Sequence, residues 1–155
     1  MTRRIYGIRW ARECSKPDFP HEAPRKGTKA AGLAYERALA TALGSAARHG
    51  PWFEFEDRNG LGHCQPDFLL RKGDQILVLE AKLTTTREAW AQLEWLYFPV
   101  LECLLRGHAR IGGAVVAKHL SPWVRQELIV DSLSAAWSAA QRTTPCLHWL
   151  PRTPL

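Results

Sequence analysis

Residues 65–84 constrain the fold more than any other stretch, because two apolar runs there flank a short polar segment. The runs at 68–70 and 75–81 are rich in branched and apolar side chains, and residues 72–74 between them favour a turn. This pattern predicts a β-hairpin. The second run is apolar at both odd and even positions, so we expect a central strand that is covered on both faces.

Charged side chains mark the two ends of this predicted hairpin. Asp67 begins the first strand, and Glu80 and Lys82 end the second, where α/β proteins place their sites. Neighbouring carboxylates repel each other, and a bound divalent cation removes that repulsion. Mg²⁺ takes one or two carboxylates with water and phosphate oxygens, so Asp67, Glu80 and the Ala81 carbonyl are predicted ligands. Lys82 would face the attacking water or the scissile phosphate. A surface hairpin with an ordinary Glu–Lys pair is the alternative.

Pro66 and Asp67, followed by Glu80-Ala81-Lys82, resemble the signature of the PD-(D/E)XK nuclease superfamily. The segment 32–36, Gly-Leu-Ala-Tyr-Glu, is similar to the GxxxE element of its RecB-like and lambda-exonuclease-like branches. Gln92 lies where those branches carry a QxxxY element, although the next tyrosine follows after five residues instead of four. The resemblance covers about residues 29–118. It implies a nuclease or junction resolvase that acts on DNA with Mg²⁺, for which Mn²⁺ substitutes.

The residues before the hairpin predict a helix over 28–49, because alanine and leucine dominate there and Gly50-Pro51 stops the run. Glu36 shares a face with apolar residues at three- and four-residue spacings. If that face packs on the sheet, Glu36 points toward the hairpin carboxylates and supports the metal or a metal-bound water. The alternative is a glutamate at the helix rim that pairs with Arg37.

The remaining segments complete the expected fold. We predict a strand at 52–57 that joins the sheet, a flexible loop at 58–63, a helix at 87–106 with a kink or break at Pro99, a buried strand at 111–118, a helical region from Pro122 and an extended tail at 146–155. The strand–helix–strand order favours a parallel crossover. The prediction is an α/β fold with a restriction-endonuclease-like core, in which helices flank a central mixed β-sheet of about four strands.

Positive charge gathers near the N-terminus. Residues 1–30 contain eight Lys or Arg and three acidic residues, whereas the whole chain has a net charge of +6. A basic segment broken by prolines is typical of an extended arm that follows a polyanion, and glycines in the 58–63 loop would let its backbone approach a ligand. The predicted nucleic-acid contacts are Arg3, Arg4, Arg9, Arg12, Lys26, Lys29, Asn59 and His63. One alternative is a solubilising tail. Another is that Ile5, Tyr6, Ile8 and Trp10 form an edge strand or pack on the sheet.

The length of 155 residues allows one domain. We divide it into an N-terminal arm (1–27), a catalytic core (28–120) and a C-terminal helical region with a tail (121–155). No apolar run approaches the roughly 20 residues that span a membrane, and the first residues lack the apolar core of a signal peptide. We therefore expect a cytoplasmic protein without a membrane partner.

The four cysteines are scattered and form no CxxC pair, which argues against a disulfide framework. Cys14 with His21, and Cys146 with His148, would form a zinc site only if the two ends of the chain met. The sequence leaves that question open.

These observations predict a Mg²⁺-dependent deoxyribonuclease that hydrolyses phosphodiester bonds. Its predicted catalytic residues are Glu36, Asp67, Glu80, Lys82 and Gln92. The small size favours a stand-alone enzyme of recombination, repair or phage DNA processing. One rival is a nucleic-acid-binding protein that keeps the fold without the chemistry, and another is a subunit of a larger assembly. Endonuclease or exonuclease action stays open, as does the oligomeric state, a homodimer included.

Overall fold

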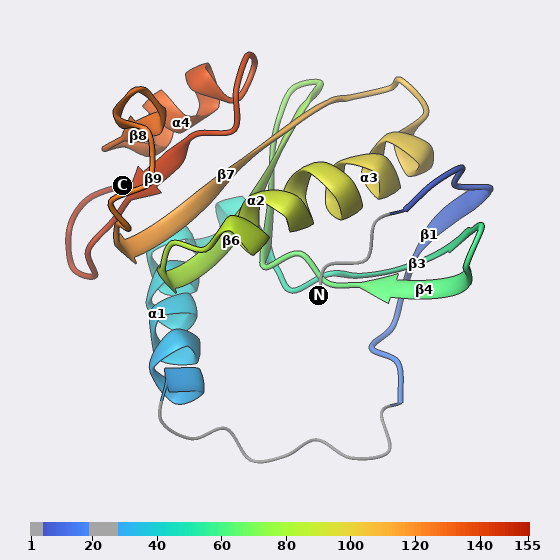
Figure 1. Ribbon diagram of the computed structural model, residues 1–155, viewed down its shortest axis with the longest axis horizontal. Helices are drawn as coiled ribbons and strands as arrows, with labels where there is room; N and C mark the ends of the chain where they lie inside the picture. Colours follow the sequence, from blue (N-terminus) through green and yellow to red (C-terminus); the bar gives the residue numbers. More distant parts are fainter. Residues whose placement is uncertain (1–4, 19–27) are drawn as a thin grey trace.

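Nine strands in two sheets make up the framework of the computed structural model, which describes residues 5–18 and 28–155 (Figure 1). The smaller sheet is antiparallel and contains β1 (Trp10–Cys14), β3 (Trp52–Asp57) and β4 (Gly60–Cys64). The larger sheet is mixed and contains, in spatial order, β2 (Ala47–His49), β5 (Phe68–Lys72), β6 (Gln75–Thr84), β7 (Arg110–His119), β9 (Cys146–His148) and β8 (Ile129–Val130). The predictions made for Arg3, Arg4, His21 and Lys26 lie outside the described residues.

Three helical segments accompany the larger sheet. The first is α1 (Thr28–Leu43). The second runs without interruption through α2 (Arg87–Gln92), a π-helical turn η2 (Leu93–Tyr97) and α3 (Phe98–Leu105), and the third is α4 (Leu133–Ala139). Two short 3₁₀ turns are η1 (Gly44–Ala46) and η3 (Gln126–Leu128). Among the described residues, no helix combines the length and apolar character that crossing a bilayer requires.

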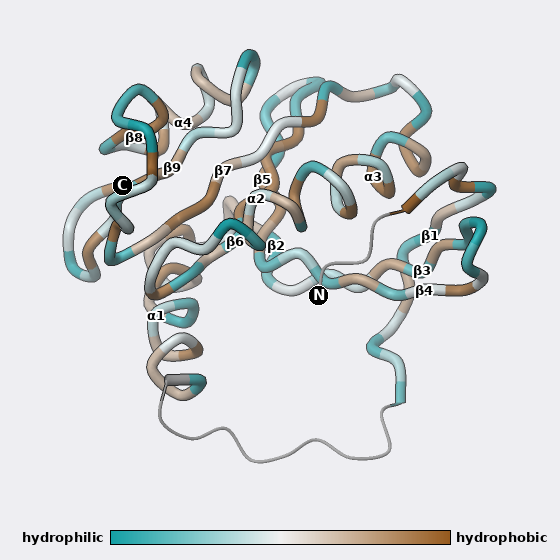
Figure 2. Tube along the Cα trace, in the orientation of Figure 1, coloured by the Kyte–Doolittle hydropathy of each residue, from teal (hydrophilic) through white to brown (hydrophobic). Residues whose placement is uncertain are grey.

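The predicted hairpin is confirmed as β5 and β6, which pair antiparallel from Phe68 opposite Leu79 down to the turn. It lies in the middle of the sheet, and β6 runs parallel to β7, as the strand–helix–strand order predicts. Side chains of β6 alternate between two apolar clusters: Leu77 packs with residues of α1, and Val78 packs with residues of the α2–α3 segment. The central part of β7 is hydrophobic, as expected for a strand covered on both faces (Figure 2).

The smaller sheet packs on the same side of the larger sheet as α3. Phe53 and Phe55 of β3 belong to one buried cluster with Leu93 and Val100 of the helical segment. The close packing of α3 on β7 needs Gly113, because a Cβ at that position would lie 2.7 Å from the ring of Phe98. The chain is therefore an α/β protein whose mixed sheet has six strands instead of about four, with a second sheet beside it.

The N-terminal residues form part of the fold, so the prediction of an extended arm is wrong for the described ones. β1 pairs antiparallel with β3, from Trp10 opposite Glu56 to Cys14 opposite Trp52. Ile5 is buried in the core. The competing interpretation, an edge strand packed against a sheet, describes this region correctly, since apolar side chains among the arginines anchor it.

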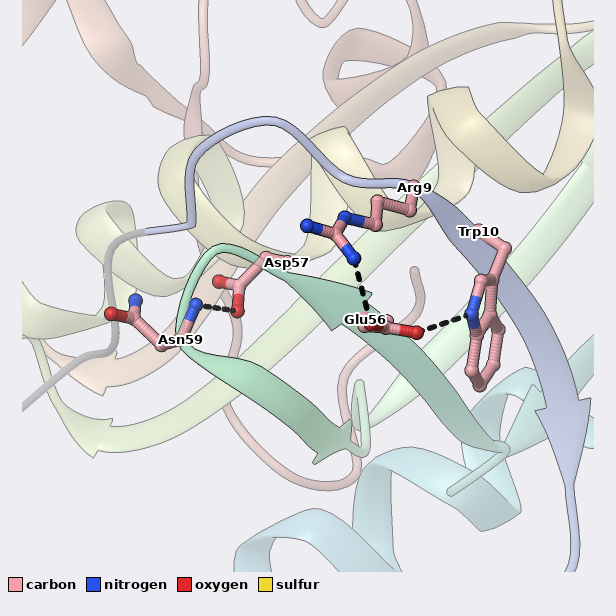
Figure 3. Close-up of polar contacts among 5 residues, drawn as sticks. All are labelled: Arg9, Trp10, Glu56, Asp57 and Asn59. Atoms are coloured by element: carbon pink, nitrogen blue, oxygen red, sulfur yellow. Dashed lines mark hydrogen bonds and ion pairs between the residues drawn. The ribbon is translucent and has the colours of Figure 1, made fainter.

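Residues 52–57 are a strand with every second side chain buried, as the alternating pattern predicts. This strand joins the smaller sheet and not the sheet of the hairpin, so that part of the prediction is wrong. The expected flexible loop at 58–63 is also wrong, because β4 begins at Gly60 and pairs with β3. Asn59 lies in the tight turn between them, where its N–H donates to Asp57 Oδ1 at 2.9 Å (Figure 3).

Two helix boundaries differ from the sequence prediction for identifiable reasons. α1 ends at Leu43 because Gly44 adopts a left-handed backbone with φ of 59°, and residues 47–49 then form the edge strand β2. The expected break near Pro99 is present as η2, in which the N–H of Phe98 donates to the carbonyl of Leu93, five residues earlier. Proline cannot donate to a helical carbonyl, and the wider turn accommodates it.

The C-terminal region is less helical than predicted. Between Pro122 and Ala139, α4 is the only α-helix, and β8 occupies residues 129–130. The expected tail begins instead with β9, which inserts between β7 and β8. Cys146 and Leu147 are fully buried there. Pro151 and Pro154 made this stretch resemble a tail, but the apolar residues pair before these prolines begin.

Candidate active site

Asp67 immediately precedes β5. Backbone pairing of β5 with β6 ends at Phe68, and the side chain of Asp67 makes the next hydrogen bond to β6. Its Oδ2 accepts a hydrogen bond from the N–H of Ala81 in β6 at 2.8 Å. Its backbone carbonyl accepts from the N–H of Gly50 at 2.8 Å. Gly50 has a φ of +66°, a conformation that favours glycine. Backbone groups on two sides therefore fix the direction of the Asp67 carboxylate.

Glu80 lies in β6 one residue before that donor, and its side chain is buried. Its Oε1 lies 3.4 Å from Nζ of Lys82, which is about one-third exposed. Its Oε2 has no hydrogen-bond partner among the described residues. A buried carboxylate oxygen without a partner destabilises a fold by its lost hydration. This atom is therefore a place where a ligand would offset the cost.

Glu36 of α1 reaches the same place, as the helical pattern predicts. It shares a hydrogen bond with the carboxyl group of Asp67. It also lies 3.6 Å from Nε2 of His49, whose ring stacks on Phe68 at 4.7 Å. α1 lies beside the carboxyl ends of β6 and β7 (Figure 1). The three carboxylates thus come from a helix, the residue before β5, and the end of β6.

The electrostatics of this cluster follow from its burial. Burial, the charge of Glu80 and the hydrogen bond with Glu36, in that order, raise the pKa of Asp67 far above its usual range. Burial also raises the pKa of Glu80, although the charge of Lys82 partly lowers it again. Both shifts mean that the cluster disfavours negative charge unless another cation is present.

An open hollow of about 390 Å³ gives solvent access to these groups. Its walls come from the first half of α1 and the last residues of β6. They include Lys29, Glu36, Asp67, Glu80, Ala81 and Lys82. Of the predicted nucleic-acid contacts that the structure describes, Lys29 is therefore the one brought to the carboxylates.

Tyr97 is a further residue at this site, and the five-residue spacing obscured it in the sequence. The π turn η2 adds one residue to the helical repeat, so positions five apart come to lie nearly above each other. Tyr97 is buried, and its hydroxyl donates to the carbonyl of Gln65 at 3.3 Å. The charges of Glu80 and Asp67, after burial itself, raise its pKa. Gln92 has a buried Oε1 without a partner among the described residues.

His49 was also missed, because the helical pattern appeared to continue through it. The edge strand β2 pairs with β5, and His49 is opposite Phe68 in that register. The proximity of His49 to Glu36 can be predicted only if residues 47–49 are recognised as the strand β2. The Gly44 helix stop was the sequence signal that could have revealed it.

The donor set fits Mg²⁺ better than Zn²⁺. Residues 5–18 and 28–155 contain no group of three or more His, Cys, Asp or Glu side chains arranged to hold a metal. Structural zinc needs four such ligands, whereas Mg²⁺ takes one or two carboxylates and completes its shell with water. Asp67 and Glu80, with the unpartnered Oε2 of Glu80, meet that smaller requirement. Cys146 is buried in β9, and His148 instead contacts the carbonyl of Lys118 at 3.0 Å.

Among the described residues, the other predicted nucleic-acid contacts lie in or next to the smaller sheet, and Arg9, Arg12 and His63 each have an acidic partner there. Arg9 pairs with Glu56 at 3.3 Å (Figure 3), and Nε of Arg12 donates to Glu54 at 2.6 Å. His63 lies 3.6 Å from Glu54. The structure therefore does not bring Arg9, Arg12, Asn59 or His63 to the carboxylate cluster.

The site stands on these residues and distances alone. Comparison of the chain with protein-family models, with curated proteins and with solved structures finds no match in any of the three.

Proposed function

We propose that this chain is a Mg²⁺-dependent nuclease that hydrolyses phosphodiester bonds, with DNA as its substrate. The observation that carries the proposal is the meeting of Asp67, Glu80 and Lys82 in one open hollow, where Glu80 Oε2 is buried without a partner. Three carboxylates, of which only Glu80 has a lysine as its ion-pair partner among the described residues, form an arrangement that costs stability unless it serves a ligand. The central hairpin flanked by helices is compatible with the restriction-endonuclease-like core that the resemblance to the PD-(D/E)XK superfamily implies.

Each residue has a role in this proposal. Asp67 and Glu80 would hold Mg²⁺, which when bound supplies a more acidic water and neutralises charge on the phosphate. The N–H of Ala81 and the hydrogen bond between Asp67 and Glu36 orient Asp67 for that purpose. Lys82 places a cation beside Glu80 at the hollow, where it would bind a phosphate oxygen and stabilise the added negative charge.

Gln92 would orient water or phosphate through its amide group. Its buried Oε1 has no partner among the described residues, which leaves it available to accept a hydrogen bond. Tyr97 lies on the next turn of the same segment, where burial and then the charge of Glu80 raise its pKa. The intact set of carboxylates and Lys82 favours an enzyme over a binding protein that has lost its chemistry.

The deciding experiment compares amide substitutions at two kinds of carboxylate. Wild type, Asp67→Asn, Glu80→Gln and the control Glu56→Gln are incubated with linear duplex, circular single-stranded and branched DNA, in Mg²⁺ and in EDTA. We expect cleavage by wild type and Glu56→Gln in Mg²⁺ alone, and none by the other two variants. Cleavage by Asp67→Asn or Glu80→Gln at the wild-type rate would refute the proposal, as would a wild type that cuts none of these substrates and no RNA.

A further inference from the structure

A second hollow, of about 750 Å³, adjoins the candidate active site. It lies between α1 and residues 149–153, and the two hollows meet at Leu83, which lines both. Apolar side chains of α1, Ala34 and Ala38 among them, form one wall. Lys118, His119 and Arg152 line it as well. Its volume is within the range of roughly 300–1,000 Å³ that is usual for ligand sites.

The positive charge of this groove is not neutralised by neighbouring acids. Among the described residues, Lys118 and Arg152 make no ion pair, whereas Arg9, Arg12 and Arg48 each pair with a glutamate. Lys118 is the second-last residue of β7 and lies beside the end of β6, since Lys82 is opposite Ala117 in the parallel register. The groove therefore brings a free cation from β7 and another from the C-terminal turn to the edge of the catalytic hollow.

The turn that carries Arg152 is held rigidly. Arg152 has a φ of 73°, a left-handed conformation that a non-glycine residue seldom adopts. The indole N–H of Trp149 donates to the carbonyl of Thr153 at 3.1 Å, and the hydroxyl of Tyr35 donates to the carbonyl of Trp149 at 2.8 Å. These bonds tie the turn to α1, so Arg152 keeps its place in the groove wall without a partner of its own.

We propose that this groove binds the single strand of nucleic acid that leads to the scissile phosphate. The proposal deepens the function proposed above and rests on it. Phosphates pair with Lys118 and Arg152, and unpaired bases pack on the apolar wall of α1. Bases in a duplex are stacked and paired inside the helix, where they do not reach such a wall. The preferred substrate therefore has a single-stranded segment at the cleavage position.

Binding measured without catalysis tests the groove directly. Fluorescence anisotropy in EDTA follows a labelled oligothymidine and a blunt duplex of equal length across a salt series. Lys118→Ala and Arg152→Ala should each weaken oligothymidine binding and lower its log–log salt slope by about 0.7, the value for one lost phosphate contact on a single strand. The matched control is Arg142→Ala, because Arg142 is exposed next to Gln141, which lines a hollow at the opposite end of β6.

Occluding the groove gives an independent readout. Ala34 is exposed, so Ala34→Trp should leave thermal melting unchanged while it lowers oligothymidine affinity severalfold and spares duplex affinity. Equal slopes for Lys118→Ala, Arg152→Ala and Arg142→Ala would overturn the inference, and so would a wild type that prefers the duplex.

If the variants lose oligothymidine binding and wild type cleaves no nucleic acid, the groove stands and the proposed nuclease fails. If wild type cleaves in Mg²⁺ with no effect of the groove variants, the nuclease stands and the groove fails.

Discussion

On the smaller sheet the glutamates of β3 each face a partner, whereas the carboxylates of the larger sheet face one another. Glu54 accepts from Arg12, and Glu56 accepts from Arg9 and from the indole N–H of Trp10 at 2.8 Å (Figure 3). Asp67 and Glu80, by contrast, are buried next to each other, and Glu80 pairs with the partly exposed Lys82. The first arrangement stabilises a fold, and the second lowers its stability in return for a charged site.

This difference separates structural charge from charge that is available to a ligand. Counting basic residues along the sequence directs attention to the N-terminal segment. The structure shows that the described arginines of β1 serve the pairing of β1 with β3, whereas unpaired cations gather around the carboxyl ends of β6 and β7. Net charge therefore locates a binding surface only after ion pairs within the protein are taken into account.

The largest effect is expected at Lys82, the lysine that pairs with Glu80. Lys82→Ala should lower turnover by about 10²- to 10³-fold, the scale of losing one preorganised electrostatic contact. It should leave Mg²⁺ affinity nearly unchanged, because Lys82 is not a ligand. Single-turnover cleavage and calorimetric Mg²⁺ titration measure the two quantities. Loss of metal binding as complete as in Asp67→Asn would show that Lys82 acts through the metal site and not on the substrate.

The next effect tests the smaller sheet as a structural unit. Ile5→Ala should lower the free energy of unfolding by about 2–4 kcal/mol, because it removes a buried aliphatic side chain from the core shared by both sheets. Removing residues 1–27 should destabilise the domain further, since β3 would lose β1. Urea denaturation measures both. A truncated chain with wild-type stability would restore the interpretation of this segment as an arm.

Periodicity and turn chemistry predicted the parts of this fold that depend on local sequence. The hairpin, α1 over its whole length to Leu43, the buried strand β7 and the position of Glu36 all follow from spacing. The sheet to which each strand belongs could not be predicted in this way. The alternating pattern of residues 52–57 indicates that one face of the strand is buried, but it does not indicate which sheet or helix covers that face. β9 was missed for a similar reason, since a three-residue strand is specified by its neighbours.

The candidate site shows the same division. Asp67, Glu80 and Lys82 could be predicted from the sequence because they lie within one hairpin, only 16 residues long from Asp67 to Lys82. Tyr97 required the π turn, and His49 required the edge strand β2, neither of which leaves a regular pattern. The basic groove required the C-terminal turn to meet α1, which is a contact across more than half of the chain.

A smaller effect concerns stability in the absence of metal. Asp67→Asn should raise the free energy of unfolding in EDTA by about 1–3 kcal/mol, because it removes one charge from a cluster that disfavours charge. The folded-state pKa of Asp67 is raised, so the stability that this group contributes is fully present at low pH and is lost as pH rises. The gain from the substitution should therefore widen above pH of about 4, the usual pKa of an aspartate.

Thermal melting across pH, with EDTA or with Mg²⁺, checks this expectation. Mg²⁺ should stabilise wild type and leave Asp67→Asn nearly unchanged, which closes the gap between them. Glu56→Gln is the matched control, and it should lose stability or stay unchanged at every pH because Glu56 already has partners. A destabilised Asp67→Asn in EDTA would mean that the hydrogen bond from Ala81 outweighs the repulsion.

The smallest effect is expected at Arg12. This residue distinguishes the two interpretations of the N-terminal arginines, as contacts to nucleic acid or as partners of glutamates in the smaller sheet. Its guanidinium is about two-thirds exposed and donates to Glu54, so Arg12→Ala should cost less than about 1 kcal/mol, as exposed ion pairs do. Because this charge is already paired within the smaller sheet, the salt dependence of DNA binding should stay the same. A duplex slope that falls by about 0.9 would instead assign a phosphate contact to Arg12 and extend the binding surface from the groove to β1.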